Sequence, residues 1–348
     1  MKLTVSLEKK LRGFTLKTDF TLQDEVFALL GASGCGKSMT LKCIAGIECP
    51  DKGRIVLDGK VLFDSRQKIN LPPQQRQIGY LFQNYALFPN MTIAENIRFV
   101  MPSSSPKTTE KLQDLLTRFQ LTGLEDAYPA SLSGGQQQRA ALARILASQA
   151  KLLLLDEPFA ALDSYLKGQL ETELMDILPA YSGAAIFVSH DRGEVYRLAD
   201  RAAVMHQGQL DIPQNTKALF HNPQTLTATL LTGCKNISRA QRVDNGHIYA
   251  ADWDLTLKTA AEPSPKVKYA AIRAHFLTAQ EMTAGENIFP MEVLRVIEDT
   301  FSYIIMVRPQ GKAVKPLRWE ISKLEWHKQK NTSLSLYLPP EQIILLER

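Results

Sequence analysis

The 348-residue chain lacks any apolar run long enough to cross a bilayer. Its longer runs, such as those at residues 26–30 and 152–155, fall far short of the roughly 18 to 20 residues that a membrane-spanning helix requires. The N-terminus has no apolar core followed by small residues, so no secretory signal is visible and we expect a cytoplasmic protein. No segment carries five or six like charges and the net charge is only +5, which argues against disorder and a polybasic nucleic-acid tail.

Cysteine is also scarce, and its spacing excludes the usual cysteine-based sites. Cys35, Cys43, Cys49 and Cys234 form no C-x-x-C pair and have no metal-ligand spacing with the six histidines. We therefore expect four reduced thiols rather than disulfides.

The length predicts two or three domains. Residues 1–232 alternate apolar runs with amphipathic segments, as expected of strands and helices around a mostly parallel sheet. From residue 236 the runs are short and alternate apolar with polar residues, for example at 254–258 and 333–338, which is typical of antiparallel strands. The sequence therefore predicts an α/β domain at 1–232, a boundary near 232–236 and a small all-β domain at 236–348.

A phosphate-binding loop is the strongest motif. It has the pattern G-x-x-x-x-G-K-[ST], followed by Met39, and consists of Gly31, Ala32, Ser33, Gly34, Cys35, Gly36, Lys37 and Ser38. It follows the apolar run at 26–30 and opens a helical stretch at 37–45 that stops at Gly46. Successive backbone N–H groups and the positive end of the helix favour an anion. We expect Lys37 to contact the β- and γ-phosphates and Ser38 to bind Mg²⁺; the alternative is a glycine-rich surface turn.

Cys35 lies inside this loop. The backbone donors and Lys37 predict a lowered thiol pKa and a reactive cysteine, protected by MgATP. The alternative is a thiol that points into the protein and is inert.

Two acidic residues, Asp156 and Glu157, follow the leucine run at 152–155. The carboxyl end of a buried parallel strand opens on a ligand crevice, so we expect Asp156 to orient water around Mg²⁺ and Glu157 to act as general base. His190 follows another apolar run, at 184–189, and could reach the γ-phosphate. Without the phosphate loop, these residues would be interpreted as solvated ends of strands.

A second anion site is predicted where a serine and two glycines precede the helical stretch 137–147. Its residues are Ser133, Gly134, Gly135 and Gln136.

Together with Gln83 and Asp163, these motifs occur in an order that resembles the nucleotide-binding subunit of an ABC transporter. The resemblance implies an α/β P-loop NTPase fold of ABC type, a helical subdomain at about 84–147, ATPase activity, and ATP and Mg²⁺ as cofactors. In that family two copies sandwich two ATP molecules. The turn that consists of Ser133, Gly134, Gly135 and Gln136, called the Ser133 turn below, would then contact the nucleotide bound to the partner copy. Asp163 would communicate across the dimer.

The resemblance also implies that Gln83 couples Mg²⁺ and water to the permease. Ala160 stands where the family often has Ser, and Phe14 is a candidate to stack on adenine or equally a core residue. The expected partners are a second copy, integral-membrane permease subunits and, indirectly, an extracytoplasmic solute-binding protein, with no nucleic acid. The expected location is the cytoplasmic face of the membrane. Alternatives are a non-transport ABC ATPase acting on nucleic acid or the ribosome, and a purely regulatory binding module.

The C-terminal part resembles the TOBE or MOP domains of importers, with a single MOP-like unit at 285–348. The stretches 271–275, 287–293 and 317–322 look most like molybdate import ATP-binding proteins. We therefore expect import of molybdate or a related oxyanion such as tungstate or sulfate, with polyamine or sugar import as the alternative.

The oxyanion-binding segment of that group, Ser-x-Arg-Asn, is altered here. Ala284 and Glu286 replace the hydroxyl and the arginine, and only Asn287 remains; Glu320 adds a further acid. This predicts weak or absent molybdate binding by the C-terminal domain, because a carboxylate repels a dianion. The alternative is a site formed by Ser322 and Lys323.

Overall fold

The computed structural model describes residues 1–101, 108–160, 162–181, 183–280, 285–329 and 334–348. The chain divides into two compact units, Met1–Lys217 and Ala218–Arg348. This division precedes the segment 232–236, where the sequence places the boundary. The apolar helix α8 (Leu226–Leu231) explains the difference, because its Leu226 packs against Ile237, Ile344 and other residues of the second unit.

One large mixed sheet forms the framework of the first unit. Its strands are β1 (Lys2–Lys10), β2 (Thr15–Gln23), β3 (Val26–Leu30), β4 (Lys52–Leu57), β5 (Lys60–Asp64), β6 (Ile69–Asn70), β7 (Ile78–Leu81), β8 (Leu152–Asp156), β9 (Ala184–Ser189), β10 (Arg201–His206), β11 (Gln209–Leu210) and β12 (Gln214–Asn215). Neighbouring strands follow the order β6-β5-β4-β1-β2-β11-β10-β3-β9-β8-β7, and β12 pairs with β10. The stretch from β10 to β7 is parallel, as predicted.

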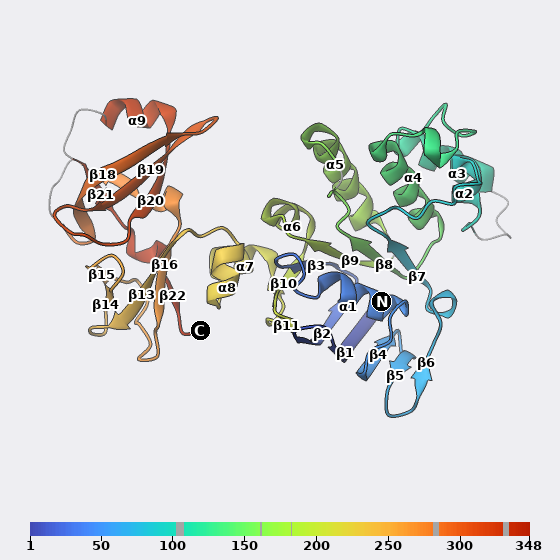
Figure 1. Cartoon of the computed structure of the whole chain (residues 1–348), viewed down its shortest axis with the longest axis horizontal. Helices are drawn as coiled ribbons and strands as arrows, with labels where there is room; N and C mark the ends of the chain where they lie inside the picture. Colours follow the sequence, from blue (N-terminus) through green and yellow to red (C-terminus); the bar gives the residue numbers. More distant parts are fainter. Residues whose placement is uncertain (102–107, 161, 182, 281–284, 330–333) are drawn as a thin grey trace. The chain divides into compact units, whose positions relative to one another are not determined.

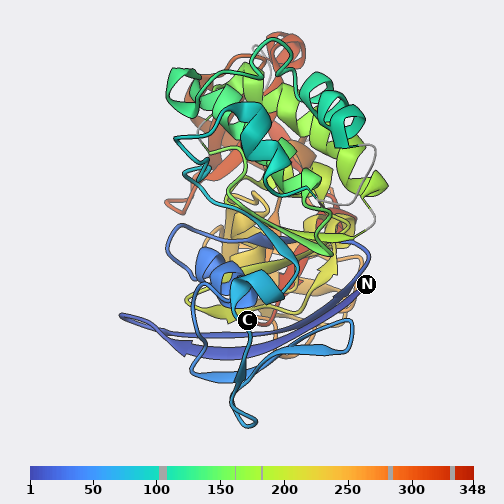
Figure 2. The same ribbon diagram turned by 90° about the vertical axis from the view of Figure 1, so that its right-hand side faces the viewer.

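Burial explains why three of these strands are continuous apolar runs. Every residue of β3, β8 and β9 is buried, as expected for central parallel strands with both faces covered. Figures 1 and 2 agree that α1 (Lys37–Ala45) lies on one side of these strands and α4 and α5 on the other. Leu41 and Ile44 of α1 share one apolar cluster with Leu3 of β1 and Ile55 of β4, so the antiparallel part of the sheet covers the outer face of α1.

The remaining helices of the first unit lie between the later strands. They are α2 (Ile93–Arg98), α3 (Thr108–Arg118), α4 (Gly134–Ala147), α5 (Ser164–Ala180), α6 (Arg192–Leu198), α7 (Thr216–His221), which runs across the division, and the short 3-10 turns η1 (Pro73–Gln75) and η2 (Pro129–Ser131). Helices α2, α3 and α4 pack on one another, and Figure 1 shows them as one group beside β7. The residues at 84–147 that were predicted as a helical subdomain contain this group.

Antiparallel strands dominate the second unit. They are β13 (Asn236–Arg242), β14 (His247–Ala250), β15 (Leu255–Lys258), β16 (Tyr269–Ile272), β17 (Thr278–Gln280), β18 (Ile288–Glu298), β19 (Ser302–Pro309), β20 (Leu317–Ser322), β21 (Ser335–Tyr337) and β22 (Ile344–Leu346), with α9 (Lys323–Gln329), η3 (Ala274–Phe276) and η4 (Pro340–Gln342). In the part of the chain that the structure describes, they form two sheets, β15-β14-β13-β16-β22 and β17-β21-β18-β19-β20. A small β domain is thus present, as predicted, and the second unit also contains the helices α8 and α9.

The two sheets of the second unit interleave along the chain. β22, near the C-terminus, pairs with β16 in the first sheet, whereas β17 precedes residue 285 and belongs to the second. Trp253 from the first sheet region and Trp319 from β20 share one apolar core. The segment 285–348, predicted as a MOP-like unit, therefore does not form a sheet of its own.

Candidate nucleotide-binding site

The predicted site residues of the first unit converge because four parallel strands end at one edge of the sheet. β3, β9, β8 and β7 are adjacent in this order and run in the same direction. The loop 31–36 follows the carboxyl end of β3, His190 follows β9, Glu157 follows β8, and Gln83 lies two residues after β7. This edge is where ligands bind in open parallel sheets.

The loop between β3 and α1 has the backbone of a phosphate cradle. Gly34 and Gly36 have φ values of 78° and 114°, which favour glycine, and a Cβ atom on Gly31 would lie 2.5 Å from the carbonyl oxygen of Met205. Lys37 Nζ donates to the carbonyl oxygens of Gly31 and Ala32 at 2.8 and 2.9 Å. Ala32, Ser33 and Gly34 are exposed, so the loop is open to a ligand.

The predicted lowering of the Cys35 thiol pKa is wrong. The residue is 8% exposed, and burial raises the pKa of its thiol; the lowering by Lys37, whose Nζ lies 4.0 Å from Sγ, is smaller. The side chain points into the core cluster rather than toward solvent, so only its backbone can contact a phosphate. This is the alternative that the sequence left open.

Asp156, at the end of β8, is held by two hydroxyl groups. Ser38 Oγ donates to Oδ1 at 2.7 Å, and Tyr80 Oη donates to Oδ2 at 2.9 Å. Burial, followed by the charge of Asp156 and this hydrogen bond, raises the pKa of Tyr80. The predicted pair Ser38 and Asp156 is thus brought together, whereas sequence reasoning missed Tyr80, which stands in an otherwise apolar strand.

Glu157 and His190 also meet. His190 Nδ1 lies 3.6 Å from Glu157 Oε1, and the two side chains are 57% and 19% exposed respectively. Glu157 has a φ of 49°, a left-handed value that is unusual for a side chain of this size. Such backbone strain concentrates at functional sites, and here it turns the chain away from β8 directly after Asp156.

An ion-pair network next to His190 was not predicted. Lys167 of α5 binds the carboxylates of Asp191 and Glu194, the latter at 2.7 Å. Burial raises the pKa of Asp191, but hydrogen bonds from Lys167 and from the backbone N–H of Gly193 outweigh it and lower the pKa overall. The network connects α5 to the segment that carries His190.

The Ser133 turn begins α4 as predicted. Ser133 Oγ accepts from the Gln136 N–H, and Gln136 Oε1 accepts from the Ser133 N–H, which forms a capping box. Gly134 is exposed at this helix start, and Gly135 is buried, where a Cβ atom would lie 2.9 Å from Leu166. The two polar side chains thus shape the turn and leave its tip open.

Asp163 caps α5, and Gln83 is exposed. Asp163 Oδ1 accepts from the N–H groups of Tyr165 and Leu166 at 2.9 and 3.0 Å. Ala161, next to Ala160, lies outside the described residues. Gln83 follows β7 by two residues, and the backbone beyond it is held by Arg144 of α4, which donates to the carbonyl oxygens of Tyr85 and Ala86.

Phe14, the candidate adenine platform, lies beside the phosphate loop. A ring atom of Phe14 is 3.6 Å from the position that a Cβ of Gly36 would take, and another is 2.5 Å from the position that a Cβ of Gly208 would take. Phe14 is partly buried against the core cluster, so part of the residue remains accessible.

The altered oxyanion segment of the second unit is occupied by internal contacts. Asn287 is buried; its side chain accepts from the Lys258 N–H and donates to the carbonyl oxygens of Lys258 and Leu338. Glu286 pairs with Lys258. Ala284 lies outside the described residues.

The alternative oxyanion donors are likewise engaged. Ser322 Oγ donates to Glu325 at 2.7 Å, and Lys323 Nζ lies 2.6 Å from Glu298. Glu320 is 3.7 Å from Arg318. Carboxylates therefore hold the hydroxyl and the ammonium group on which that site depends.

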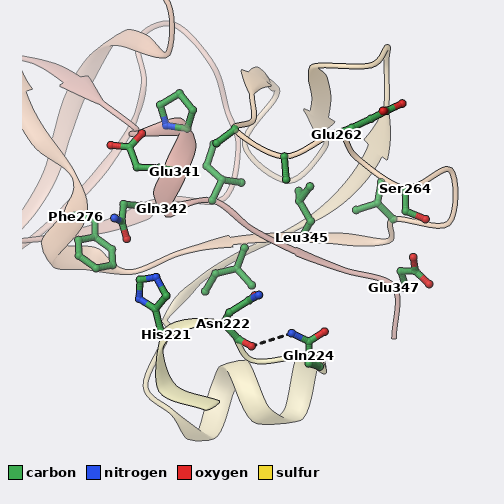
Figure 3. Close-up of a pocket in the computed structure, with 16 residues that line it drawn as sticks. His221, Asn222, Gln224, Glu262, Ser264, Phe276, Glu341, Gln342, Leu345 and Glu347 are labelled. Carbon is green, nitrogen blue, oxygen red and sulfur yellow. Dashed lines mark hydrogen bonds between the residues drawn. The ribbon is translucent and has the colours of Figure 1, made fainter. Parts of the chain in front are cut away.

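A cavity of about 380 Å³ in the second unit has an acidic lining. Figure 3 shows Glu262, Glu341 and Glu347 around it, with His221 and Asn222 on the side of the helices; Asn222 accepts a hydrogen bond from Gln224. Its lining contains no Lys or Arg. Such a lining does not favour a dianion.

The comparisons with known proteins agree with this geometry. The family model described as ABC transporter matches residues 17–160. The sulfate/thiosulfate import ATP-binding protein of Mannheimia succiniciproducens is 32% identical over 358 aligned residues, which cover 99% of this chain and 98% of that protein. The Fe(3+) ions import ATP-binding protein of Haemophilus influenzae is 41% identical over 229 residues, 65% of each chain.

A solved structure shares the fold. The dimeric structure of a bacterial ABC transporter cassette is 25% identical, with a TM-score of 0.52, and the match covers 62% of this chain and 99% of that one. Within the described residues, no helix is both long and apolar enough to span a bilayer.

A phosphate loop after the buried parallel strand β3, with an acidic pair at the carboxyl end of β8, two strands away in the same sheet, defines a P-loop ATPase that binds ATP. With a relative of this identity matched over almost its whole length, the chain belongs to the ABC transporter family, as an ATP-binding subunit of the importer type.

Proposed function

We propose that this chain is the ATP-hydrolysing subunit of an importer for a small inorganic oxyanion. The observation that carries the solute class is the similarity to a sulfate/thiosulfate import protein, because that alignment covers 99% of the chain and so includes the second unit. The match to the Fe(3+) ions import ATP-binding protein covers only 65% of this chain. Sulfate or thiosulfate is the first solute to test, and molybdate or tungstate, the prediction from the sequence, is the second.

In this proposal the loop 31–36 and the start of α1 bind the phosphates of ATP. The backbone N–H groups, the helix end and Lys37 provide positive potential, and the exposed residues of the loop allow access. Phe14 would offer its accessible part to adenine. Met39 follows Ser38 in the first turn of α1 and would lie next to the phosphates.

The donor set at Asp156 fits Mg²⁺. A hydroxyl and a carboxylate lie 2.7 Å apart next to the phosphate loop, and Mg²⁺ is usually bound by one or two such oxygens together with substrate phosphates. We assign Ser38 and Asp156 to this ion, with Gln83 as a further ligand from the end of β7. When bound, the ion neutralises charge on the phosphates.

Glu157 is proposed as the general base that accepts a proton from the attacking water. It is the carboxylate next to Asp156, it is mostly buried, and it faces His190 across 3.6 Å. His190, which follows the neighbouring strand β9, would orient both the γ-phosphate and Glu157. The network of Lys167 and Asp191 supports the position of His190.

The expected partners are a second copy of the chain, permease subunits in the membrane and, indirectly, a solute-binding protein. The turn of Ser133, Gly134 and Gly135, which is exposed at Ser133 and Gly134, is suited to a phosphate bound by another copy. Asp163, the N-cap of α5, would communicate across this dimer. The chain would lie peripherally on the cytoplasmic face of the membrane.

Uptake by membrane vesicles that contain the whole complex tests the proposal. Labelled sulfate, thiosulfate, molybdate and ferric ion are offered separately, with ATP enclosed on the cytoplasmic side. ATP-dependent uptake of one of the oxyanions, abolished by Lys37→Ala, is expected. Uptake of ferric ion alone would contradict the oxyanion assignment, and failure of the chain to copurify with any permease would contradict a role in transport.

A further inference from the structure

Tyr80 and Ser38 each donate a hydrogen bond to a different carboxylate oxygen of Asp156. Ser38 donates to Oδ1 from α1, whereas Tyr80 donates to Oδ2 at 2.9 Å from β7. Asp156 is only 6% exposed, so solvent contributes little to the orientation of its carboxylate. Two donors from two different elements therefore determine its plane.

The position of the Tyr80 hydroxyl is itself fixed by the fold. Tyr80 is paired with Leu154 in the parallel ladder between β7 and β8, and its ring packs against Phe82 with a centroid distance of 4.5 Å. The terminal torsion of an aspartate has a broad preference, so an unsupported carboxylate samples many orientations. A phenol anchored on the adjacent strand removes this freedom.

We propose that Tyr80 is a positioning residue that orients the Asp156 carboxylate for Mg²⁺. The proposal rests on the assignment of Asp156 to Mg²⁺ made above. Tyr80 acts through Asp156 and needs no contact with the nucleotide. Residues that support a metal ligand in this way typically contribute 10- to 100-fold to metal affinity.

The test measures the affinity of the full chain for a non-hydrolysable ATP analogue, at saturating Mg²⁺ and again in excess EDTA. In Tyr80→Phe, which keeps the ring and removes the hydroxyl, affinity at saturating Mg²⁺ should fall about tenfold. Affinity in EDTA should be unchanged, because the phosphate loop is untouched. The unfolding temperature of the nucleotide-free variant checks that the strand is intact.

Tyr249→Phe is the matched control. It removes an equivalent hydrogen bond, from Tyr249 Oη to Asp254 Oδ1 at 2.8 Å, in the second unit. This variant should leave both affinities unchanged.

The outcomes separate the two proposals. Wild-type Mg²⁺ dependence in Tyr80→Phe, or an equal loss with and without Mg²⁺, would overturn the role of Tyr80 and leave the Mg²⁺ site standing. A wild-type chain whose affinity for the analogue did not depend on Mg²⁺ would contradict the Mg²⁺ site itself, and the role of Tyr80 with it.

Discussion

Arg76 shows how a single buried side chain supports the phosphate loop from the far end of α1. The guanidinium is 1% exposed and donates to the carbonyl oxygens of Cys43 and Ile44 at 3.0 and 2.8 Å. These carbonyls belong to the last turn of α1, where a cation also interacts favourably with the helix dipole. A Cβ atom on Gly46, the residue that ends the helix, would lie 2.5 Å from Arg76 Nε, so this position favours glycine.

Replacing Arg76 with Met should destabilise the chain by about 3 kcal/mol, because the apolar side chain fills the space but leaves buried carbonyl groups without donors. Urea unfolding measures the difference. Arg54→Met is the control, since Arg54 is 57% exposed and its pair with Asp64 should contribute less than about 1 kcal/mol. Equal destabilisation by the two variants would contradict the capping role of Arg76.

The residues of the site that form local patterns could be predicted from the sequence. The phosphate loop, Asp156 and Glu157 follow apolar runs that predict strands, and the fold places them at one edge. Arg76, Tyr80 and Lys167 could not be predicted, because each acts on a residue far away in the sequence. The sequence left the orientation of Cys35 open for a related reason, since it depends on packing behind the loop.

At the scale of elements, Lys167 connects α5 to α6. It binds Asp191, the N-cap of α6, and Glu194 in the first turn of that helix. Burial would lower the pKa of Lys167, but hydrogen bonds with Asp191 and Glu194 raise it overall. The pKa of Asp191 is lowered, as described above. These opposite shifts determine the pH range in which the link stabilises the fold.

Because the pKa of Asp191 is lower in the folded state than its unfolded pKa of about 3.9, its ion pair stabilises the fold fully above about pH 3.9. This stabilisation is lost as the pH falls through the folded pKa. Because the pKa of Lys167 is higher in the folded state than its unfolded pKa of about 10.4, its ion pairs stabilise the fold fully below about pH 10.4. This stabilisation is lost as the pH rises through the folded pKa. Lys167→Met should therefore cost about 1 kcal/mol or less at neutral pH, and less again below about pH 4.

Urea unfolding at a series of pH values measures this prediction. Lys151→Met, which removes an exposed pair with Asp58, is the control and should have little effect. A cost of Lys167→Met that stayed the same down to strongly acid pH would show that the ion pair is not its cause.

Element boundaries in the first unit were well predicted, but the arrangement of the second unit was not. The runs at 26–30 and 184–189 are strands β3 and β9, and the stretch 37–45 is helix α1 ending at Gly46. Long-range pairing, such as that of β22 with β16, leaves no local signal, because a strand near the C-terminus has the same alternation whichever sheet it joins. Consequently, the all-β class was predictable and the strand pairing was not.

At the scale of the whole molecule, the second unit carries contacts that disfavour feedback by an oxyanion. Asn287 serves as an internal bridge, Ser322 and Lys323 are held by carboxylates, and the cavity in Figure 3 has an acidic lining. We expect isothermal titration of molybdate or sulfate into the full chain, with MgADP saturating the phosphate loop, to give no binding at micromolar concentration. Micromolar or tighter binding would show that these contacts rearrange around the anion.

We propose that the site at the end of β8 hydrolyses ATP with Glu157 as its general base. The most direct test compares ATP hydrolysis and ATP binding in the wild-type chain, Glu157→Gln and Lys37→Ala. Glu157→Gln should lower the hydrolysis rate by about 10² to 10⁴ and retain ATP affinity, since loss of a general base leaves the phosphate cradle intact. Lys37→Ala should instead lose ATP affinity. Wild-type turnover in Glu157→Gln, or equal ATP affinity in the two variants, would contradict this account of the site.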